Sequence, residues 1–110
     1  MNPLRSKESL PPLDLPPEAI VVLCGLIARQ TITVRQRRRL SILWRLCSRN
    51  LRRTAASLGC TFRTVRRWYE RGLRLTEHLA QGPDRPSEGQ LRAVLLTTVA
   101  DAPRPGAPPT

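Results

Sequence analysis

The sequence predicts an all-α fold, a small helical bundle that contains a helix-turn-helix and has disordered, proline-rich termini. Five of the eleven prolines precede residue 18 and six follow residue 82. The central block is therefore free of the residue that interrupts helix interiors. Apolar residues recur there at spacings of three and four, the period of amphipathic helices. Capping residues and one glycine, Gly59, divide the block into separate helices.

The first predicted helix begins at Pro17 and runs to about Arg29. Proline suits the first turn because its missing N–H is not needed there, and the carboxylate of Glu18 complements the helix dipole. Residues 1–16 are polar and broken by prolines, so we expect them to be a disordered arm. The inward face of the helix is predicted from helical spacing to be Ile20, Leu23, Cys24 and Ile27.

The second predicted helix runs from Val34 to about Arg49, with Thr33 as its N-cap. The β-branched residues of "TITV" are poor helix formers and separate it from the first helix. We interpret its tryptophan as a core residue rather than a platform for stacking bases. The predicted inward face comprises Leu40, Leu43, Trp44 and Cys47.

Two further helices are predicted on either side of a tight turn. Asn50 caps the third helix, residues 51–58, and Gly59 ends it where the chain must turn left-handed. Thr61 caps the fourth helix, which runs from Phe62 to Gly72. The inward positions are predicted to be Leu51, Ala55 and Leu58 on the third helix and Val65, Trp68 and Tyr69 or Gly72 on the fourth.

The remaining sequence gives weaker signals. Residues 73–82 are predicted to form a short separate helix, and Ser87 to cap one more helix before residue 100. We therefore expect a helical domain at residues 17–82, with its helix-turn-helix at residues 50–72. A linker with an additional helix should follow at residues 83–100, and a proline-rich tail at residues 101–110.

Positive charge is concentrated in the middle of the chain. The whole sequence carries a formal charge of +11. Residues 29–74 contain fourteen arginines and one acid, Glu70, which is 14 − 1 = +13. Such a field attracts polyanions, because each phosphate that it neutralises releases condensed counterions. We interpret the run "RQRRR", residues 35–39, as a solvated face or a source of non-specific attraction.

The three cysteines, Cys24, Cys47 and Cys60, have no metal-binding spacing and are predicted to be free thiols at buried or nearly buried positions. Free thiols fit the reducing cytoplasm, where a nucleoid-associated location is expected. The apolar run "AIVVLCGLIA" is too short to span a bilayer, so no membrane association is predicted.

The turn at Gly59 joins two helices in the manner of a helix-turn-helix. Ala55 is small enough for the second helix to cross closely, and Val65 and Trp68 close the core from the other side. Residues left facing outward near the start of the second helix are those that a recognition helix places against base edges. Arginines of the preceding helix would hold the phosphate backbone. The predicted contacts to double-stranded DNA are Asn50, Arg52, Arg53, Thr61, Phe62, Arg63, Thr64, Arg66, Arg67 and Arg71.

The stretch "NLRRTAASLGCTFRTVRRW", residues 50–68, resembles the N-terminal, homeodomain-like helix-turn-helix of bacterial insertion-sequence transposases related to the mariner group. Thr54 departs from the pattern, which has isoleucine or valine there. The likeness extends over residues 17–72, and "DAPRPGAPPT" looks like the linker before a second DNA-binding subdomain. This resemblance implies that the chain recognises transposon ends and that it stops before the catalytic domain. The residues that match the family pattern are Ala55, Leu58, Gly59, Thr61, Thr64, Val65 and Trp68.

No catalytic chemistry is predicted. Transposases of this kind cut DNA with three carboxylates and two metal ions on a separate α/β domain. The eight acids here are scattered over tails and helix ends, and His78 has no partner near it in sequence. No cysteine–histidine or serine–histidine pair offers nucleophilic chemistry. We therefore expect a protein that is not an enzyme, with no metal site and no cofactor.

Three alternatives remain open. One is a free-standing transcriptional regulator that reads two half-sites as a homodimer, through a stripe at Leu91, Val94, Leu95 and Val99. Another is a helical protein–protein adaptor in which the charge is incidental. The last is an RNA-binding domain, which the four aromatic residues of the chain support only weakly.

Overall fold

A computed structural model describes residues 10–48, 50–82 and 85–100, which form five α-helices and no strand. The predicted all-α class is therefore confirmed for the described part of the chain. Residues 1–9 and 101–110, which include the outer parts of the predicted disordered termini, lie outside it. The helices are α2 (Pro17–Ala28), α3 (Val34–Leu46), α4 (Leu51–Leu58), α5 (Phe62–Gln81) and α6 (Glu88–Thr98).

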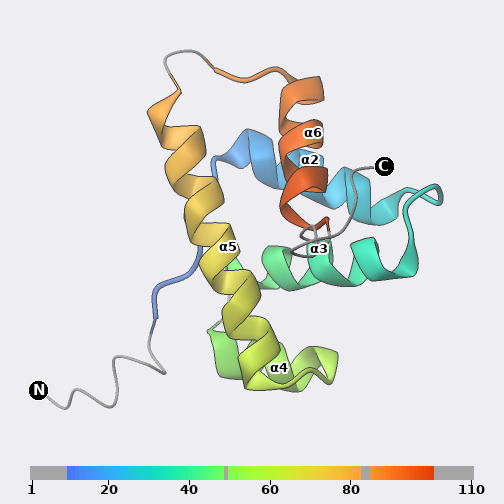
Figure 1. The fold of residues 1–110 in the computed structure, drawn as a ribbon, viewed down its shortest axis with the longest axis vertical. Helices are drawn as coiled ribbons and strands as arrows, with labels where there is room; N and C mark the ends of the chain where they lie inside the picture. The colour runs from blue at the N-terminus through green and yellow to red at the C-terminus, as the bar shows by residue number, and fades with distance from the viewer. Residues whose placement is uncertain (1–9, 49, 83–84, 101–110) are drawn as a thin grey trace, which may run out of the picture.

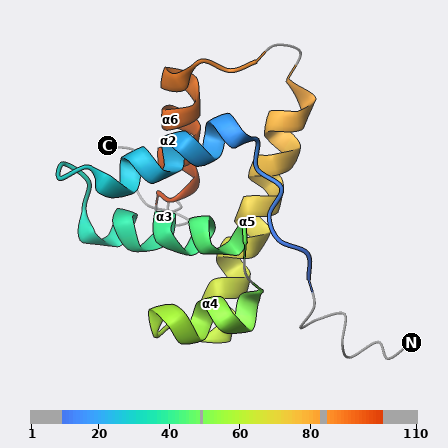
Figure 2. The ribbon, with the colours of Figure 1, turned by 180° about the vertical axis from the view of Figure 1, so that it is seen from behind.

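The long helix α5 connects the two ends of the bundle (Figure 1). The short helix α4 packs against the first half of α5, and α6 packs against α2 and the second half of α5. Seen from behind, α2 and α3 run side by side, and the end of α3 meets α5 (Figure 2). One hydrophobic core contains buried residues from all five helices, so the described residues pack as a single unit.

The helix starts follow the predicted caps. The side chains of Thr33, Asn50, Thr61 and Ser87 each accept a hydrogen bond from the backbone N–H three residues later. At Thr33 and Ser87 a glutamine side chain also accepts from the cap backbone N–H, which completes a capping box. All four predicted N-caps are confirmed.

The buried face of α2 differs from the predicted one. It consists of Ala19, Leu23 and Leu26, whereas Cys24 is exposed and the predicted residues at positions 20 and 27 are only partly buried. The reason is that α2 packs against both α3 and α6, which turns the side of Ala19 inward. The prediction that all three cysteines are nearly buried is therefore wrong for Cys24.

The predicted core position of Trp44 is also wrong, because 42% of this residue is exposed. Helix α3 contacts α2, α4 and α5, and its wide buried face is centred on Leu40, Leu43 and Leu46. Trp44 lies at the edge of that face, with the guanidinium of Arg45 at 6.0 Å from its ring centroid. The helix also ends at Leu46, three residues earlier than expected.

Residues 10–16 are part of the core, in contrast to the predicted disordered arm. The side chains of Leu13 and Leu15 are 3% and 4% exposed. The segment is neither helix nor strand, and the Leu13 backbone N–H donates to the Leu46 carbonyl at 2.9 Å. The hydroxyl of Tyr69 donates to the Pro11 carbonyl at 2.7 Å. These bonds tie the segment to the C-terminal end of α3 and to the middle of α5.

Helix α5 continues through Gly72 to Gln81, so residues 73–82 do not form the separate helix that we predicted. Gly72 lies inside α5 and lets Leu13 pack closely against the helix. A Cβ at this position would lie 2.5 Å from Leu13 Cδ1. The docked segment at residues 10–16 therefore explains a glycine inside a helix, where it otherwise costs about 1 kcal/mol relative to alanine.

Helix α6 belongs to the same core. Leu91, Leu95 and Val99 are buried against the rest of the chain. The stripe suggested for a homodimer is therefore covered within one molecule, and only Val94 of that set remains partly exposed. In the described part of the chain, no helix combines the length and apolar character needed to cross a membrane.

Candidate nucleic-acid interface

The corner between α4 and α5 depends on Gly59. Its φ of 66° and ψ of 31° lie in the left-handed region, which glycine adopts without a steric penalty. The backbone N–H of Cys60 donates to the Ala55 carbonyl at 3.0 Å, which closes the end of α4. Ala55, Val65 and Trp68 are all buried, as the sequence predicted. Helices α4 and α5 are therefore held as a packed pair joined by a three-residue turn.

Helix α4 presents Arg52 and Arg53 to solvent. The other predicted contact on this side, Asn50, uses its side-chain oxygen to accept from the Arg53 backbone N–H at 2.8 Å. Thr54, the departure from the transposase pattern, is fully buried, and its hydroxyl donates to the Asn50 carbonyl at 2.9 Å. The hydroxyl is thus satisfied inside the core.

The start of α5 carries a group of exposed arginines. Arg63, Arg66 and Arg67 are exposed and line one shallow hollow together with Phe62 and Glu70. Phe62 is half-buried and packs against the core, so it supports this surface from below. The Nε of Arg66 lies 3.6 Å from Oε1 of Glu70, one helical turn further on. We call these five residues the basic face of α5.

The threonines at the start of α5 bond to each other. The Thr61 hydroxyl donates to the Thr64 hydroxyl at 2.9 Å and accepts from the Thr64 backbone N–H at 3.2 Å. Thr64 is half-buried. The two hydroxyls therefore fix the beginning of the helix beside the basic face.

Arg71, also predicted to contact DNA, has partners within the protein. Its guanidinium is 4.5 Å from the Trp68 ring centroid, and its Nη1 donates to the carbonyls of Thr98 and Ala100 at 3.3 and 3.2 Å. Arg39 of α3 lies over the same ring at 4.9 Å and donates to the Val99 carbonyl at 2.9 Å. Both arginines thus bind the C-terminal end of α6, and Arg71 is not part of the basic face.

The run at residues 35–39 has structural roles that its sequence does not indicate. Arg37 donates to the carbonyls of Ile27 and Arg29, which fastens the connection between α2 and α3. Arg38 is exposed and its Nη2 lies 3.3 Å from Cys60 Sγ, at the turn before α5. The sequence around this run predicts an amphipathic helix. It does not show which backbone carbonyls the arginine side chains contact.

No protein-family model matches the chain, nor does any curated protein or any solved structure. Function is therefore inferred from the arrangement of the chain's own side chains.

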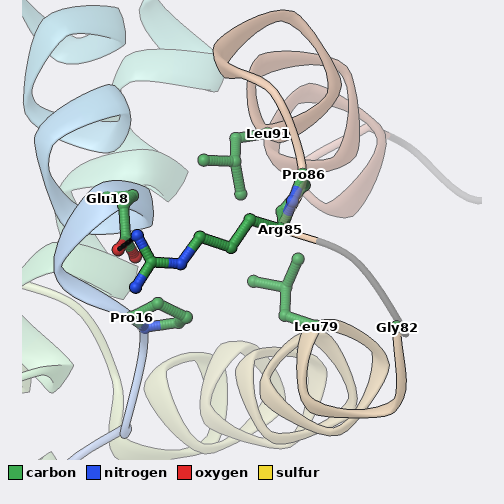
Figure 3. Close-up of a pocket in the computed structure, with 7 residues that line it drawn as sticks. All are labelled: Pro16, Glu18, Leu79, Gly82, Arg85, Pro86 and Leu91. Carbon is green, nitrogen blue, oxygen red and sulfur yellow. Dashed lines mark ion pairs between the residues drawn. The ribbon is translucent and has the colours of Figure 1, made fainter.

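A separate pocket lies between the start of α2, the end of α5 and the start of α6 (Figure 3). Arg85 extends across it toward Glu18, and their charged groups are 4.0 Å apart. The rest of the lining is mostly apolar, with Pro16, Leu79 and Leu91. Within the described ranges, no group of three or more histidine, cysteine or acidic side chains is placed to hold a metal ion.

Proposed function

We propose that the chain binds double-stranded DNA, with α4 and α5 forming a homeodomain-like helix-turn-helix and α5 entering the major groove. One observation carries the proposal. The packed corner at Gly59 buries Val65 and Trp68, and this orientation leaves Arg63, Arg66 and Arg67 exposed together near the start of α5. N-terminal positions of a recognition helix are those that contact base edges.

The chemistry of the basic face suits guanine. An arginine guanidinium donates two parallel hydrogen bonds to the O6 and N7 acceptors of guanine, which discriminates against other bases by about 1–3 kcal/mol. Arg52 and Arg53 project from the preceding helix and are assigned to the phosphate backbone, where contacts fix the register without reading sequence. The absence of acids other than Glu70 between residues 29 and 74 favours association with any duplex.

We propose transposon-end DNA as the biological target, and the support is the resemblance of residues 50–68 to the transposase helix-turn-helix. We assign the chain a binding role without catalysis. A selected target sequence that recurs as an inverted repeat around the gene would support this assignment. A target that lies only in unrelated promoters would favour a free-standing regulator.

A protein–protein adaptor is the second candidate function. It is favoured by a groove between α5 and α6 in which a partner protein could bind. Between α5 and α6 a shallow groove is lined by Leu75, His78, Ala93 and Val94. An adaptor that used this groove would have no need of the basic face. DNA binding that depends on Arg63 and not on the groove separates the two candidates.

The test measures affinity for duplex DNA over a series of salt concentrations. We expect log affinity to fall with log salt by roughly 0.9 per phosphate contacted. Arg63→Ala should change the preferred sequence, whereas Arg52→Ala should weaken all sequences alike. Arg85→Ala is the matched control, because it removes the same charge at the other end of α5 and should change the affinity little. Equal losses for all three variants would contradict the proposal.

A further inference from the structure

Glu70 is an unexpected residue on the basic face. It is the only acid between residues 29 and 74, and its side chain is 56% exposed. A carboxylate on a surface that approaches phosphates opposes binding to any DNA, because like charges repel. Glu70 must therefore either stay hydrated or bind a hydrogen-bond donor in the major groove of the DNA.

The spacing places Glu70 among the residues that would read bases. Positions 63, 66, 67 and 70 follow the helical pattern i, i+3, i+4 and i+7, which puts their side chains on one face of α5. Recognition helices of the homeodomain class contact base edges through side chains at these spacings. Glu70 also lines the same hollow as Arg63, Arg66 and Arg67.

The pairing with Arg66 matches the edge of one base pair. The two side chains place a cationic donor and an anionic acceptor 3.6 Å apart, both about half exposed. In the major groove, guanine offers two acceptors, O6 and N7, and cytosine offers an amino donor, N4. A guanidinium binds the guanine acceptors in a fork, and a carboxylate accepts from the cytosine amino group.

We propose that Glu70 is a specificity-determining residue that accepts a hydrogen bond from cytosine N4, beside an arginine contact to guanine. This inference rests on the proposed DNA binding and names the base class that one position of the target must have. The adenine amino group is the other donor in the major groove. Cytosine is favoured because only a C·G base pair also offers the neighbouring Arg66 the two acceptors of guanine.

The test selects bound sequences from a pool of random duplexes, using the full chain and two variants. We expect the wild-type selection to contain a position fixed as C·G. Glu70→Gln should lose that preference by about tenfold and move it toward adenine, because glutamine pairs with adenine N6 and N7. Glu77→Gln is the matched control, since it removes an exposed acid from the same helix two turns further on.

The outcomes separate the two proposals. If Glu70→Gln selects the same sequences as the wild type and only binds all duplexes more tightly, as Glu77→Gln should, the role of Glu70 is wrong while DNA binding stands. A wild-type selection with adenine at the affected position overturns the assignment to cytosine. If the wild-type chain retains no duplex, both proposals fail. The exposed pair contributes little to folding, so thermal unfolding of Glu70→Gln should match that of the wild type.

Discussion

Two arginines stack on Trp68 and bind the end of α6 at the same time. Arg39 and Arg71 lie 4.9 and 4.5 Å from the ring centroid, and together they donate to the carbonyls of Thr98, Val99 and Ala100. Cations are favourable at a helix C-terminus, where carbonyls lack partners within the helix. Trp68 therefore links the core of α5 to α6 through these two arginines.

We expect Arg71→Ala to lower the free energy of unfolding by about 1–2 kcal/mol, because it removes a cation–π contact and hydrogen bonds to carbonyls. Arg74→Ala, an exposed change one turn further along α5, should stay within about 0.5 kcal/mol of the wild type. Urea unfolding measures both. Since Arg71 lies off the basic face, its replacement should also reduce DNA affinity less than Arg67→Ala. A larger effect of Arg71 on binding than on stability would contradict this placement.

The cysteines should differ in reactivity. Burial, with a smaller effect of the nearby Cys24 thiol, raises the pKa of Cys47 from 9.0 to about 11, and its Sγ donates to the Leu43 carbonyl. At pH 8 we expect iodoacetamide to modify the exposed Cys24 well before Cys47, because the thiolate is the nucleophile. Mass spectrometry of digested samples measures the order. In denaturant the two rates should converge, and equal rates in the folded protein would contradict the burial of Cys47.

The same pKa gives a pH dependence of stability. Below pH 9 the Cys47 thiol is protonated in both the folded and the unfolded chain, so it does not affect the balance. Between about pH 9 and 11 the unfolded chain releases its proton first, and the free energy of unfolding should fall. Cys47→Ser should reduce this fall.

At the scale of elements, the corner between α4 and α5 depends on one backbone conformation. Gly59→Ala should destabilise the protein by about 1 kcal/mol, because alanine at a φ of 66° is strained although no atom lies within 4 Å of the added Cβ. Gly25→Ala is the control. Gly25 lies inside α2 with open space around it, so the same change should stabilise by about 0.5–1 kcal/mol. Thermal unfolding of both variants should show shifts of opposite sign, and equal shifts would contradict the role assigned to Gly59.

The helix starts could be predicted because capping is local. Thr33, Asn50, Thr61 and Ser87 bond to groups three residues away, so the sequence itself contains both partners. The turn at Gly59 could also be predicted locally, because its left-handed backbone conformation favours glycine. Buried faces were less predictable, because the number of neighbouring helices decides their width. Trp44 and Cys24 have helical spacing relative to leucines and still lie outside the core.

At the scale of the whole molecule, contacts between distant segments were the least predictable. The docking of Leu13 beside Gly72 joins residues 59 positions apart, and neither local sequence indicates the other. The same applies to Arg71, because its local sequence does not indicate its partners at the end of α6. The exposed arginines at positions 63, 66 and 67 were predictable, because the period of α5 alone places them opposite Val65 and Trp68.

The assembled bundle separates two surfaces along α5. Its first half carries the basic face and α4, its middle contacts residues 10–16, and its second half packs with α6. A helix of 20 residues is about 30 Å long, so duplex DNA on the first half can leave the far end of the bundle free.

The most direct test of DNA binding through α4 and α5 is an NMR titration of the labelled protein with a short duplex, following each backbone amide. If these helices contact the duplex, the largest shift changes should occur at residues 50–53 and 61–70, while residues 85–92 at the far end change little. Changes centred on the groove between α5 and α6, or no change at low salt, would contradict it.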